Sequence, residues 1–253
     1  MKKIALITGA TSGIGYSTAL KLAENGYDTI ITGRRLNLLS ELEKRIKKEY
    51  KTNVLSLSFD IRNNAEIIKI FEKLPSNWQN IDVLVNNAGL AVGLEPIQSG
   101  KIDDWERMID TNLKGLLYIT RKVVPTMIQN KSGHIINIGS IAGKEVYPNG
   151  NVYNATKHAV DALSQAMRID LVSFGIKVTA IHPGMVETEF SLVRFQGNEK
   201  SAKNIYKGFS PLLANDIADA IIFVVTRPSH VNINDMIIMP TAQASATVIN
   251  KEV

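Results

Sequence analysis

Short runs of β-branched and other apolar residues alternate along the chain with longer segments of helical spacing. The runs cover residues 4–8, 28–32, 54–59, 81–86, 134–139, 177–181 and 236–239. Strands that are apolar on both faces are typical of a parallel sheet covered by helices. The alternation therefore predicts a doubly wound α/β fold, with a mostly parallel seven-stranded sheet and helices on both faces.

The composition indicates an ordinary globular domain. Of the 253 residues, 45% are hydrophobic and 21% are charged. The length alone also allows two small domains, but no Pro/Gly/Ser-rich or highly charged stretch separates two halves. The apolar run at residues 4–7 is too short for a signal peptide or a membrane span. We expect a cytoplasmic protein that does not contact membranes.

Charge and cysteine content exclude several classes of site. The 29 basic and 24 acidic residues give a net charge of +5, which suits anionic ligands. The basic residues between 44 and 51 are interleaved with glutamates, which favours a solvated helix face over nucleic-acid binding. There is no cysteine, and the four histidines share no metal-ligand spacing, so we expect no metal site.

A glycine-rich loop follows the first strand run, with the spacing G-x-x-x-G-x-G. Glycines let the backbone approach a diphosphate, and a helix N-terminus presents free N–H groups and a positive dipole. Glycines also serve plain turns, but at the first strand–helix junction of an α/β domain the pattern favours nucleotide binding. The expected cofactor contacts here are Gly9, Thr11, Ser12, Gly13, Ile14 and Gly15.

Two arginines, Arg34 and Arg35, follow the second strand run. An acidic residue there would bind the ribose 2′-hydroxyl of NAD, whereas guanidinium groups match the 2′-phosphate of NADP. They could also be surface residues that open a helix, although positive charge is slightly unfavourable at that end. The pair predicts NADP (NADPH) as the cofactor.

Tyr153 and Lys157 lie four residues apart, on one face of an expected helix. A nearby ammonium is expected to lower the tyrosine pKa, so that the phenol can exchange a proton with a carbonyl oxygen. A second copy of the spacing, Tyr118 and Lys122, lies inside a long helix and is interpreted as packing. The copy at Tyr153 follows the fifth strand run, whose end carries Ser140, and position therefore favours it.

Taken together, these motifs resemble the short-chain dehydrogenase/reductase family over essentially the whole chain. Residues 8–15 match its cofactor loop, residues 86–89 (Asn-Asn-Ala-Gly) its fourth-strand motif, and residues 183–184 (Pro-Gly) the turn beside the nicotinamide. The resemblance implies one NADP-binding Rossmann domain over residues 1–253, with a substrate loop at about 184–212. It implies the catalytic residues Asn112, Ser140, Tyr153 and Lys157. It implies further cofactor contacts from Asp60, Ile61, Asn87, Ala88, Gly89, Tyr153, Lys157, Pro183, Gly184, Val186 and Thr188.

The same resemblance implies individual roles. Tyr153 is the general acid and base, and Ser140 holds the substrate oxygen. Lys157 binds the nicotinamide ribose, and Asn112 supports a water linked to that lysine. Asp60 holds the adenine, and Thr188 anchors the carboxamide of the nicotinamide. By itself, Asn112 would be interpreted as a buried polar residue that satisfies a helix kink.

Several further segments resemble the branch of NADP-dependent 3-hydroxy acid dehydrogenases, which includes serine and L-allo-threonine dehydrogenases and malonic semialdehyde reductases. They include residues 74–82, 89–96, 104–105, 150–152, 189–195 and 230–234, whereas residues 183–188 are one residue shorter than in some relatives. The branch implies L-serine, L-allo-threonine or 3-hydroxypropionate-type substrates. We expect Arg194 to bind the substrate carboxylate, together with Ser140 and Tyr153 as substrate contacts; a plain surface arginine is the alternative.

Two other functions remain open from the sequence. One is a reductase of the same family that acts on other carbonyls or on 3-oxoacyl thioesters. The other is a nucleotide-sensing protein without catalysis, which would have little need for all four catalytic residues. The resemblance also implies a homotetramer built from helices at residues 112–130 and 152–174 and from the last strand. Leu116, Leu117, Val160 and Leu163 are apolar residues that fit such an interface.

Overall fold

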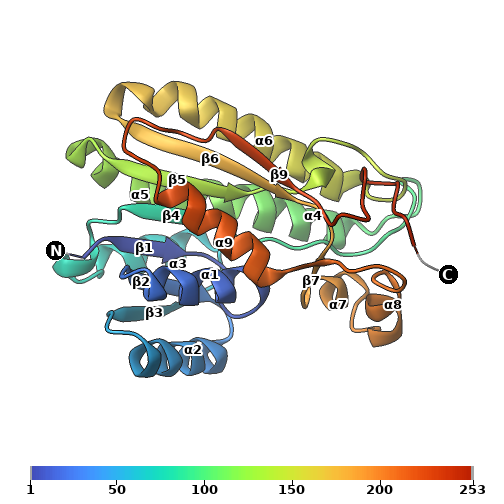
Figure 1. The fold of residues 1–253 in the computed structure, drawn as a ribbon, viewed down its shortest axis with the longest axis horizontal. Coiled ribbons are helices and arrows are strands. Elements are labelled where there is room, and N and C mark those ends of the chain that lie inside the picture. Colours follow the sequence, from blue (N-terminus) through green and yellow to red (C-terminus); the bar gives the residue numbers. More distant parts are fainter. Residues whose placement is uncertain (1, 252–253) are drawn as a thin grey trace.

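The computed structural model describes residues 2–251 and contains the predicted seven-stranded sheet (Figure 1). Its strands are β1 (Ile4–Ile7), β2 (Asp28–Gly33), β3 (Val54–Ser58), β4 (Val83–Asn86), β5 (Gly133–Ile138), β6 (Ile176–Pro183) and β9 (Asp235–Ile238). The strands lie in the order β3-β2-β1-β4-β5-β6-β9, and each neighbouring pair is parallel. The predicted doubly wound, Rossmann-type fold is confirmed.

Two hydrophobic cores form because consecutive strand residues point to opposite faces of the sheet. In β1, Ala5 and Ile7 belong to one core and Leu6 belongs to the other. The first core is covered by α1 (Gly13–Glu24), α2 (Leu36–Glu49) and α9 (Ala214–Val225). The second is covered by α3 (Asn64–Glu72), α5 (Leu116–Asn130) and α6 (Asn151–Leu171). Figure 1 shows these helices on the two sides of the sheet.

The strand order places the candidate site. The chain runs outward from β1 to β3 and then returns to continue from β4 to β9 on the other side. In such sheets the crevice beyond the carboxyl ends of β1 and β4 binds the ligand. The loops after β1, β2, β4, β5 and β6 meet at this edge and carry most of the predicted site residues.

A small substructure covers the same edge. Residues 184–212 contain β7 (Val186–Glu187), α7 (Phe190–Arg194), α8 (Glu199–Asn204) and the start of β8 (Leu212–Leu213). The strands β7 and β8 pair in parallel with each other, apart from the main sheet. They were not predicted, because two-residue strands are too short to show periodicity. Figure 1 shows α7 and α8 projecting beyond the main sheet, within the segment expected to form the substrate loop.

A long helical stretch carries a local irregularity. It consists of α4 (Ile102–Ile109), a π-helical segment η2 (Asp110–Gly115) and α5. Such π segments occur frequently at functional sites. The turn brings Gly115 against Ile61, where an added Cβ would lie 2.9 Å from the Ile61 side chain.

The residues proposed for a subunit interface divide between core and surface. Leu116 and Val160 are buried in the second core of the protomer, whereas Leu117 is exposed. Leu163 is partly buried against the same core, so the homotetramer stays a prediction, with Leu117 as the clearest surface candidate of the four. Within residues 2–251, no helix is both long and apolar enough to cross a membrane.

Candidate active site

The glycine-rich loop forms a cradle that side chains would block. Gly9 and Gly13 have φ of +68° and +54°, a left-handed backbone conformation that favours glycine. A Cβ on Gly15 would lie 2.4 Å from the Gly9 carbonyl oxygen. Gly15 therefore lets α1 pack closely beneath the loop, whereas Gly9 and Gly13 line the cavity above it. The shape fits the diphosphate of a dinucleotide at the N-terminus of a helix.

The loop after β4 is tied to the glycine-rich loop. Thr8 Oγ1 accepts hydrogen bonds from the backbone N–H groups of Asn87 and Ala88, both at 3.0 Å. The Asn87 side chain donates to the Thr8 carbonyl at 2.8 Å. These bonds hold the carboxyl ends of the adjacent strands β1 and β4 in one rigid wall. Thr8 was not predicted as a site residue, because its effect operates through Asn87 and Ala88.

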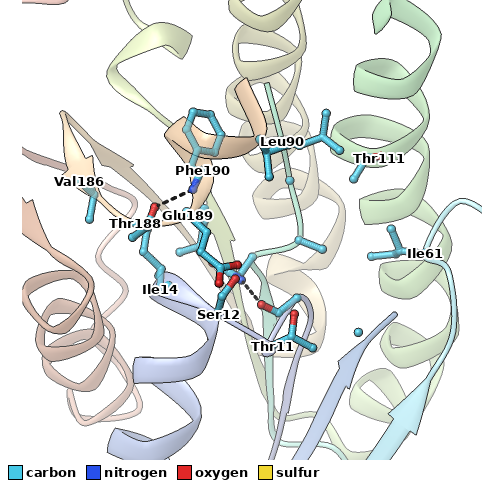
Figure 2. A pocket seen from close by; sticks show the side chains of 18 of the residues that line it. Thr11, Ser12, Ile14, Ile61, Leu90, Thr111, Val186, Thr188, Glu189 and Phe190 are labelled. Atoms are coloured by element: carbon cyan, nitrogen blue, oxygen red, sulfur yellow. Dashed lines mark hydrogen bonds between the residues drawn. The ribbon is translucent and has the colours of Figure 1, made fainter. Parts of the chain in front are cut away.

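Arg35 reaches back over the glycine-rich loop. Its Nη2 donates to Thr11 Oγ1 and to Ser12 Oγ, each at 2.9 Å. Its Nη1 pairs with Glu189 Oε2 at 2.9 Å, across the mouth of the cavity. Figure 2 shows Glu189 facing Thr11 and Ser12 from the opposite side. The guanidinium of Arg35 thus lies beside the end of β2, held by two hydroxyl groups, and is a suitable partner for a 2′-phosphate.

Asp60 and Arg34 both line the cavity. Arg62 holds the Asp60 carboxylate through its Nε and Nη2, and this bonding keeps the pKa of Asp60 below its usual range. Arg34 Nη1 lies 4.0 Å from the same carboxylate. Asp60 therefore stays an ionised acceptor at neutral pH, and Arg34 stands beside Arg35 as a second cation.

Replacing Arg35 by alanine tests the phosphate assignment. A lost charge-assisted bond costs about 1.5–3 kcal/mol, so KM for NADPH should rise about tenfold to a hundredfold. The KM for NADH, which lacks the phosphate, should change little. Steady-state kinetics with both cofactors measures this. Arg45→Ala is the control, because Arg45 bonds Glu49 on α2 and Tyr16 on α1 and does not line the cavity. Equal losses for both cofactors would contradict the assignment.

Ser140 follows β5 and is fixed by its own turn. Its Oγ accepts a hydrogen bond from the Ala142 N–H at 3.1 Å. The hydroxyl proton remains available to donate outward into the cavity, which Ser140 lines together with Tyr153 and Lys157. The structure thus brings the three predicted catalytic side chains to one wall.

Tyr153 is buried, and its environment differs from the expectation. Burial raises the pKa of the Tyr153 phenol, reinforced by Tyr147, whereas Ser140 and the charge of Arg194 act in the opposite direction. Lys157 Nζ lies 5.9 Å from the Tyr153 ring centre. The expected lowering of this pKa is therefore wrong for this structure, because desolvation by burial is the largest influence on the phenol. The phenol is protonated at neutral pH and can act as an acid.

Lys157 is also buried, on the inner face of α6. Its Nζ donates to the Ile138 carbonyl oxygen at 2.8 Å. Burial without a carboxylate partner lowers its pKa to about 8. The second Tyr-x-x-x-Lys copy differs, because Tyr118 packs against the second core and neither Tyr118 nor Lys122 lines the cavity. Location separates the two copies as predicted.

Asn112 lies in the π-helical turn and supports the wall from behind. Its Oδ1 accepts from the Leu90 N–H, and its Nδ2 donates to the Leu90 carbonyl, both at 2.8 Å. Nδ2 also donates to Thr156 Oγ1 at 3.1 Å. Asn112 thus joins the π turn to the loop after β4 and to α6, rather than satisfying the helix itself. Its link to Lys157 through a water stays a prediction.

One cavity of about 350 Å³ gathers most of the predicted set. Figure 2 shows Thr11, Ser12 and Ile14 on its loop side and Leu90, Thr111 and Ile61 on the opposite side. The predicted residues that line it are Gly9, Thr11, Ser12, Gly13, Ile14, Arg34, Arg35, Asp60, Ile61, Asn87, Ala88, Gly89, Ser140, Tyr153, Lys157, Pro183, Gly184, Val186 and Thr188. Gly15, Asn112 and Arg194 do not line it, since the first two lie behind its wall and Arg194 lines a small neighbouring hollow with Tyr153.

Two donors near Tyr153 lack hydrogen-bond partners, one from Arg194, which lines this hollow, and one from Tyr147, which lines a separate pocket. The Arg194 guanidinium lies 5.2 Å from the Tyr147 ring centre and 5.6 Å from the Tyr153 ring centre. Arg194 Nε and the Tyr147 hydroxyl are buried and lack hydrogen-bond partners. Tyr147 was missed from the sequence, because a lone tyrosine seven residues after Ser140 carries no motif. Phe190, which packs on Tyr153 with ring centres 5.6 Å apart, was missed for the same reason.

Comparison with known proteins decides the family. The short chain dehydrogenase family model matches residues 3–199. The chain belongs to the short-chain dehydrogenase family. It is 49% identical over 244 residues to the NADP-dependent 3-hydroxy acid dehydrogenase YdfG of Salmonella typhi, covering 96% of this chain and 97% of that protein. It is 41% identical over 254 residues to sulfoacetaldehyde reductase 2 of Chromohalobacter salexigens, covering all of both chains.

Solved structures agree with this membership. The closed form of serine dehydrogenase complexed with NADP+ is 44% identical and superposes with a TM-score of 0.93, covering 99% of this chain and all of that one. Serine dehydrogenase from Escherichia coli is 41% identical with a TM-score of 0.82, covering 95% of this chain and 99% of that one. The sequence-based resemblance to the short-chain dehydrogenases, and to their 3-hydroxy acid branch, is confirmed.

Proposed function

We propose that this chain transfers a hydride between NADP(H) and a small 3-hydroxy acid or its semialdehyde or keto form, of the L-serine, L-allo-threonine or 3-hydroxypropionate type. Its family membership and its relatives make it an NADP-dependent oxidoreductase that acts on CH–OH groups. The observation that supports an acid as substrate is the pair of unpartnered donors, Arg194 Nε and the Tyr147 hydroxyl, beside Tyr153.

The residues present fit NADP(H). The glycine cradle leaves room for a diphosphate, Asp60 offers an ionised acceptor on the adenine side, and Arg35 offers a cation for the 2′-phosphate. Pro183, Gly184 and Thr188 would line the nicotinamide end near Ser140 and Tyr153. NADPH, when bound, supplies the hydride for carbonyl reduction.

The catalytic side chains handle the proton. The Tyr153 phenol, kept neutral by burial, donates its proton to the carbonyl oxygen in reduction and takes it back in oxidation. The Ser140 hydroxyl donates to the same oxygen and holds the carbonyl carbon in place. Lys157, fixed by the Ile138 carbonyl, holds an ammonium at the back wall beside the Tyr153 ring.

Arg194 and Tyr147 would bind the anionic end of the substrate. Buried donors without partners lose the hydrogen bonds that they make in water, and a carboxylate that bonded both would restore them. Arg194 also stands over the Tyr153 ring, so a bound anion would lie within a few bonds of the reacting carbonyl. This geometry favours a short acid, in which the carboxylate and the oxidised carbon are close.

Arg194→Ala should lower kcat/KM for a 3-hydroxy acid about tenfold to a hundredfold, as expected for a lost charge-assisted bond. Turnover of an uncharged ketone should change little. Tyr147→Phe should show the same selectivity with a smaller loss. The ratio of the two substrates' kcat/KM values in each variant measures the effect, and an equal loss for both substrates would remove the carboxylate role.

A sulfonated aldehyde is the second candidate substrate, because a sulfonate would bind the same two donors and sulfoacetaldehyde reductase 2 is 41% identical along the whole chain. A panel of L-serine, malonic semialdehyde, sulfoacetaldehyde and an acetoacetyl thioester, each with NADPH or NADP+ and with NADH or NAD+, discriminates the candidates. Activity confined to the thioester would overturn the acid proposal. Cofactor binding without turnover of any of them would indicate a nucleotide-sensing protein instead.

A further inference from the structure

His182 is a fully buried side chain at the carboxyl end of β6, and the mechanism above does not use it. Its Nδ1 lies 3.2 Å from the backbone carbonyl oxygen of Ser140, with hydrogen-bond geometry. The ring also packs on the peptide before Ser140, because a Cβ on Gly139 would lie 2.4 Å from Nδ1. A polar ring in direct contact with the catalytic serine therefore fills the space behind it.

The other side of the ring faces an ion cluster. His182 Nε2 lies 3.0 Å from Asp235 Oδ1 on β9 and 3.5 Å from Asp161 Oδ1 on α6. The two carboxylates and the imidazole are close enough to share a metal ion. Lys144, however, places its Nζ within 3.0 Å of Asp161 and also bonds Asp235. Because Lys144 already neutralises the acids, the cluster is better explained as an ion-pair support than as a metal site.

The protonation state of the ring follows from its neighbours. Burial lowers the pKa of His182, so the ring carries one proton at neutral pH. Nε2 is buried and makes no hydrogen bond of acceptable geometry, despite its short distance to Asp235. Nδ1 does make one, and a carbonyl oxygen can only accept. The Asp235 carboxylate is an acceptor too, but its contact with Nε2 lacks hydrogen-bond geometry, so the tautomer with the proton on Nδ1 is the one that completes a hydrogen bond, to the Ser140 carbonyl.

We propose that His182 is a positioning residue that orients Ser140 for catalysis through an Nδ1–H hydrogen bond to the Ser140 backbone carbonyl. The same carbonyl accepts the Gly143 N–H at 2.8 Å, and Ser140 Oγ accepts the Ala142 N–H at 3.1 Å. Together these bonds fix both the peptide and the hydroxyl of Ser140. Without the histidine bond, the peptide can rotate, and the hydroxyl no longer points reproducibly at the substrate oxygen.

Two substitutions distinguish the contribution of Nδ1 from that of Nε2. The amide of His182→Asn reaches the position of Nδ1, whereas the amide of His182→Gln reaches the position of Nε2 and leaves the Ser140 carbonyl without its side-chain donor. For a lost hydrogen bond, we expect kcat of the Gln variant to fall about tenfold to thirtyfold and that of the Asn variant to stay within about threefold. KM for NADPH should be unchanged in both, since His182 does not line the cofactor cavity.

His134 provides the matched control. It is also buried in the sheet, but it lies at the start of β5, at the opposite end of that strand from Ser140, and it bonds Thr179. His134→Gln should lower the free energy of unfolding without changing kcat of the folded fraction. If the Gln and Asn variants of His182 lose kcat equally, or if the His134 variant loses as much as His182→Gln, then His182 is a packing residue and the proposal is wrong.

Nitrogen NMR of the wild-type protein with labelled histidine tests the proton directly, with the His182 signals assigned by their loss in His182→Asn. A proton on Nδ1 with an unprotonated Nε2 supports the proposal, and a proton on Nε2 alone overturns it. The kinetic comparison rests on the reductase activity proposed above, but this measurement does not. If the protein had no reductase activity, the proposed function would be wrong, but the NMR spectrum would still show which ring nitrogen of His182 carries the proton.

Discussion

Tyr153→Phe should lower kcat by about a hundredfold to ten-thousandfold, the usual contribution of a positioned general acid. The substitution removes one oxygen from a ring that packs against Phe190, so the fold and the cavity walls should persist. The dissociation constant for NADPH should therefore stay within about threefold of the wild-type value, because the phenol supplies little of the binding energy. Turnover measured by NADPH absorbance and binding measured by fluorescence titration give the two quantities.

Tyr118→Phe is the control, since this tyrosine has the same spacing to a lysine but packs against the second core. It should keep wild-type kcat. Loss of activity in Tyr118→Phe, with activity retained in Tyr153→Phe, would reverse the assignment of the two copies.

The raised pKa of Tyr153 also predicts a pH dependence in the wild-type protein. Below that pKa the neutral phenol predominates, so reduction, which needs the acid, should be nearly independent of pH around neutrality. Oxidation needs the phenolate, whose fraction rises tenfold per pH unit below the pKa. The kcat/KM for oxidation should therefore climb with pH, and a flat oxidation profile would exclude Tyr153 as the base.

Lys157→Met should abolish most of the activity and yet stabilise the protein in the absence of cofactor. Burial lowers the pKa of Lys157 from 10.5 to about 8, which corresponds to a cost of about 3 kcal/mol at neutral pH. Methionine has a similar length and carries no charge, so this cost disappears. The Ile138 carbonyl loses its donor, which costs about 1 kcal/mol. The expected net gain in the free energy of unfolding is about 2 kcal/mol, measured by urea unfolding.

The sign of the pH dependence is specific to a depressed lysine pKa. Between about pH 8 and about pH 10.5, the unfolded chain binds a proton that the folded chain has released. The contribution of Lys157 to the free energy of unfolding of the wild-type protein therefore rises with pH in this range. The advantage of Lys157→Met should therefore be largest below about pH 8 and shrink above it. Lys122→Met, at the partly exposed lysine of the second copy, should change stability by less than about 0.5 kcal/mol. A Lys157 variant that is destabilised at every pH would show that the buried ammonium is not under strain.

The sequence was sufficient to predict the parallel sheet, because buried strands on both faces leave uninterrupted apolar runs that differ from helical spacing. Because parallel strands end at one edge, the residues after β1, β2, β4, β5 and β6, which include most of the residues that the motifs singled out, lie near one another. The glycine-rich loop, Ser140, Tyr153 and Lys157 were found this way and line one cavity. The two-residue strands β7 and β8 could not be predicted, because their pairing is a contact between segments more than twenty residues apart.

Spacing and position along the chain, by themselves, determined the fold, the family and which Tyr-x-x-x-Lys copy lies at the site. Only the tertiary structure decided the electrostatics of that site. The pKa of Tyr153 is raised rather than lowered, because burial, which depends on the three-dimensional packing, is the largest influence on it and also lowers the pKa of Lys157. Tyr147 and His182 likewise gained their significance from packing, which places an unpartnered phenol beside Arg194 and an imidazole behind Ser140.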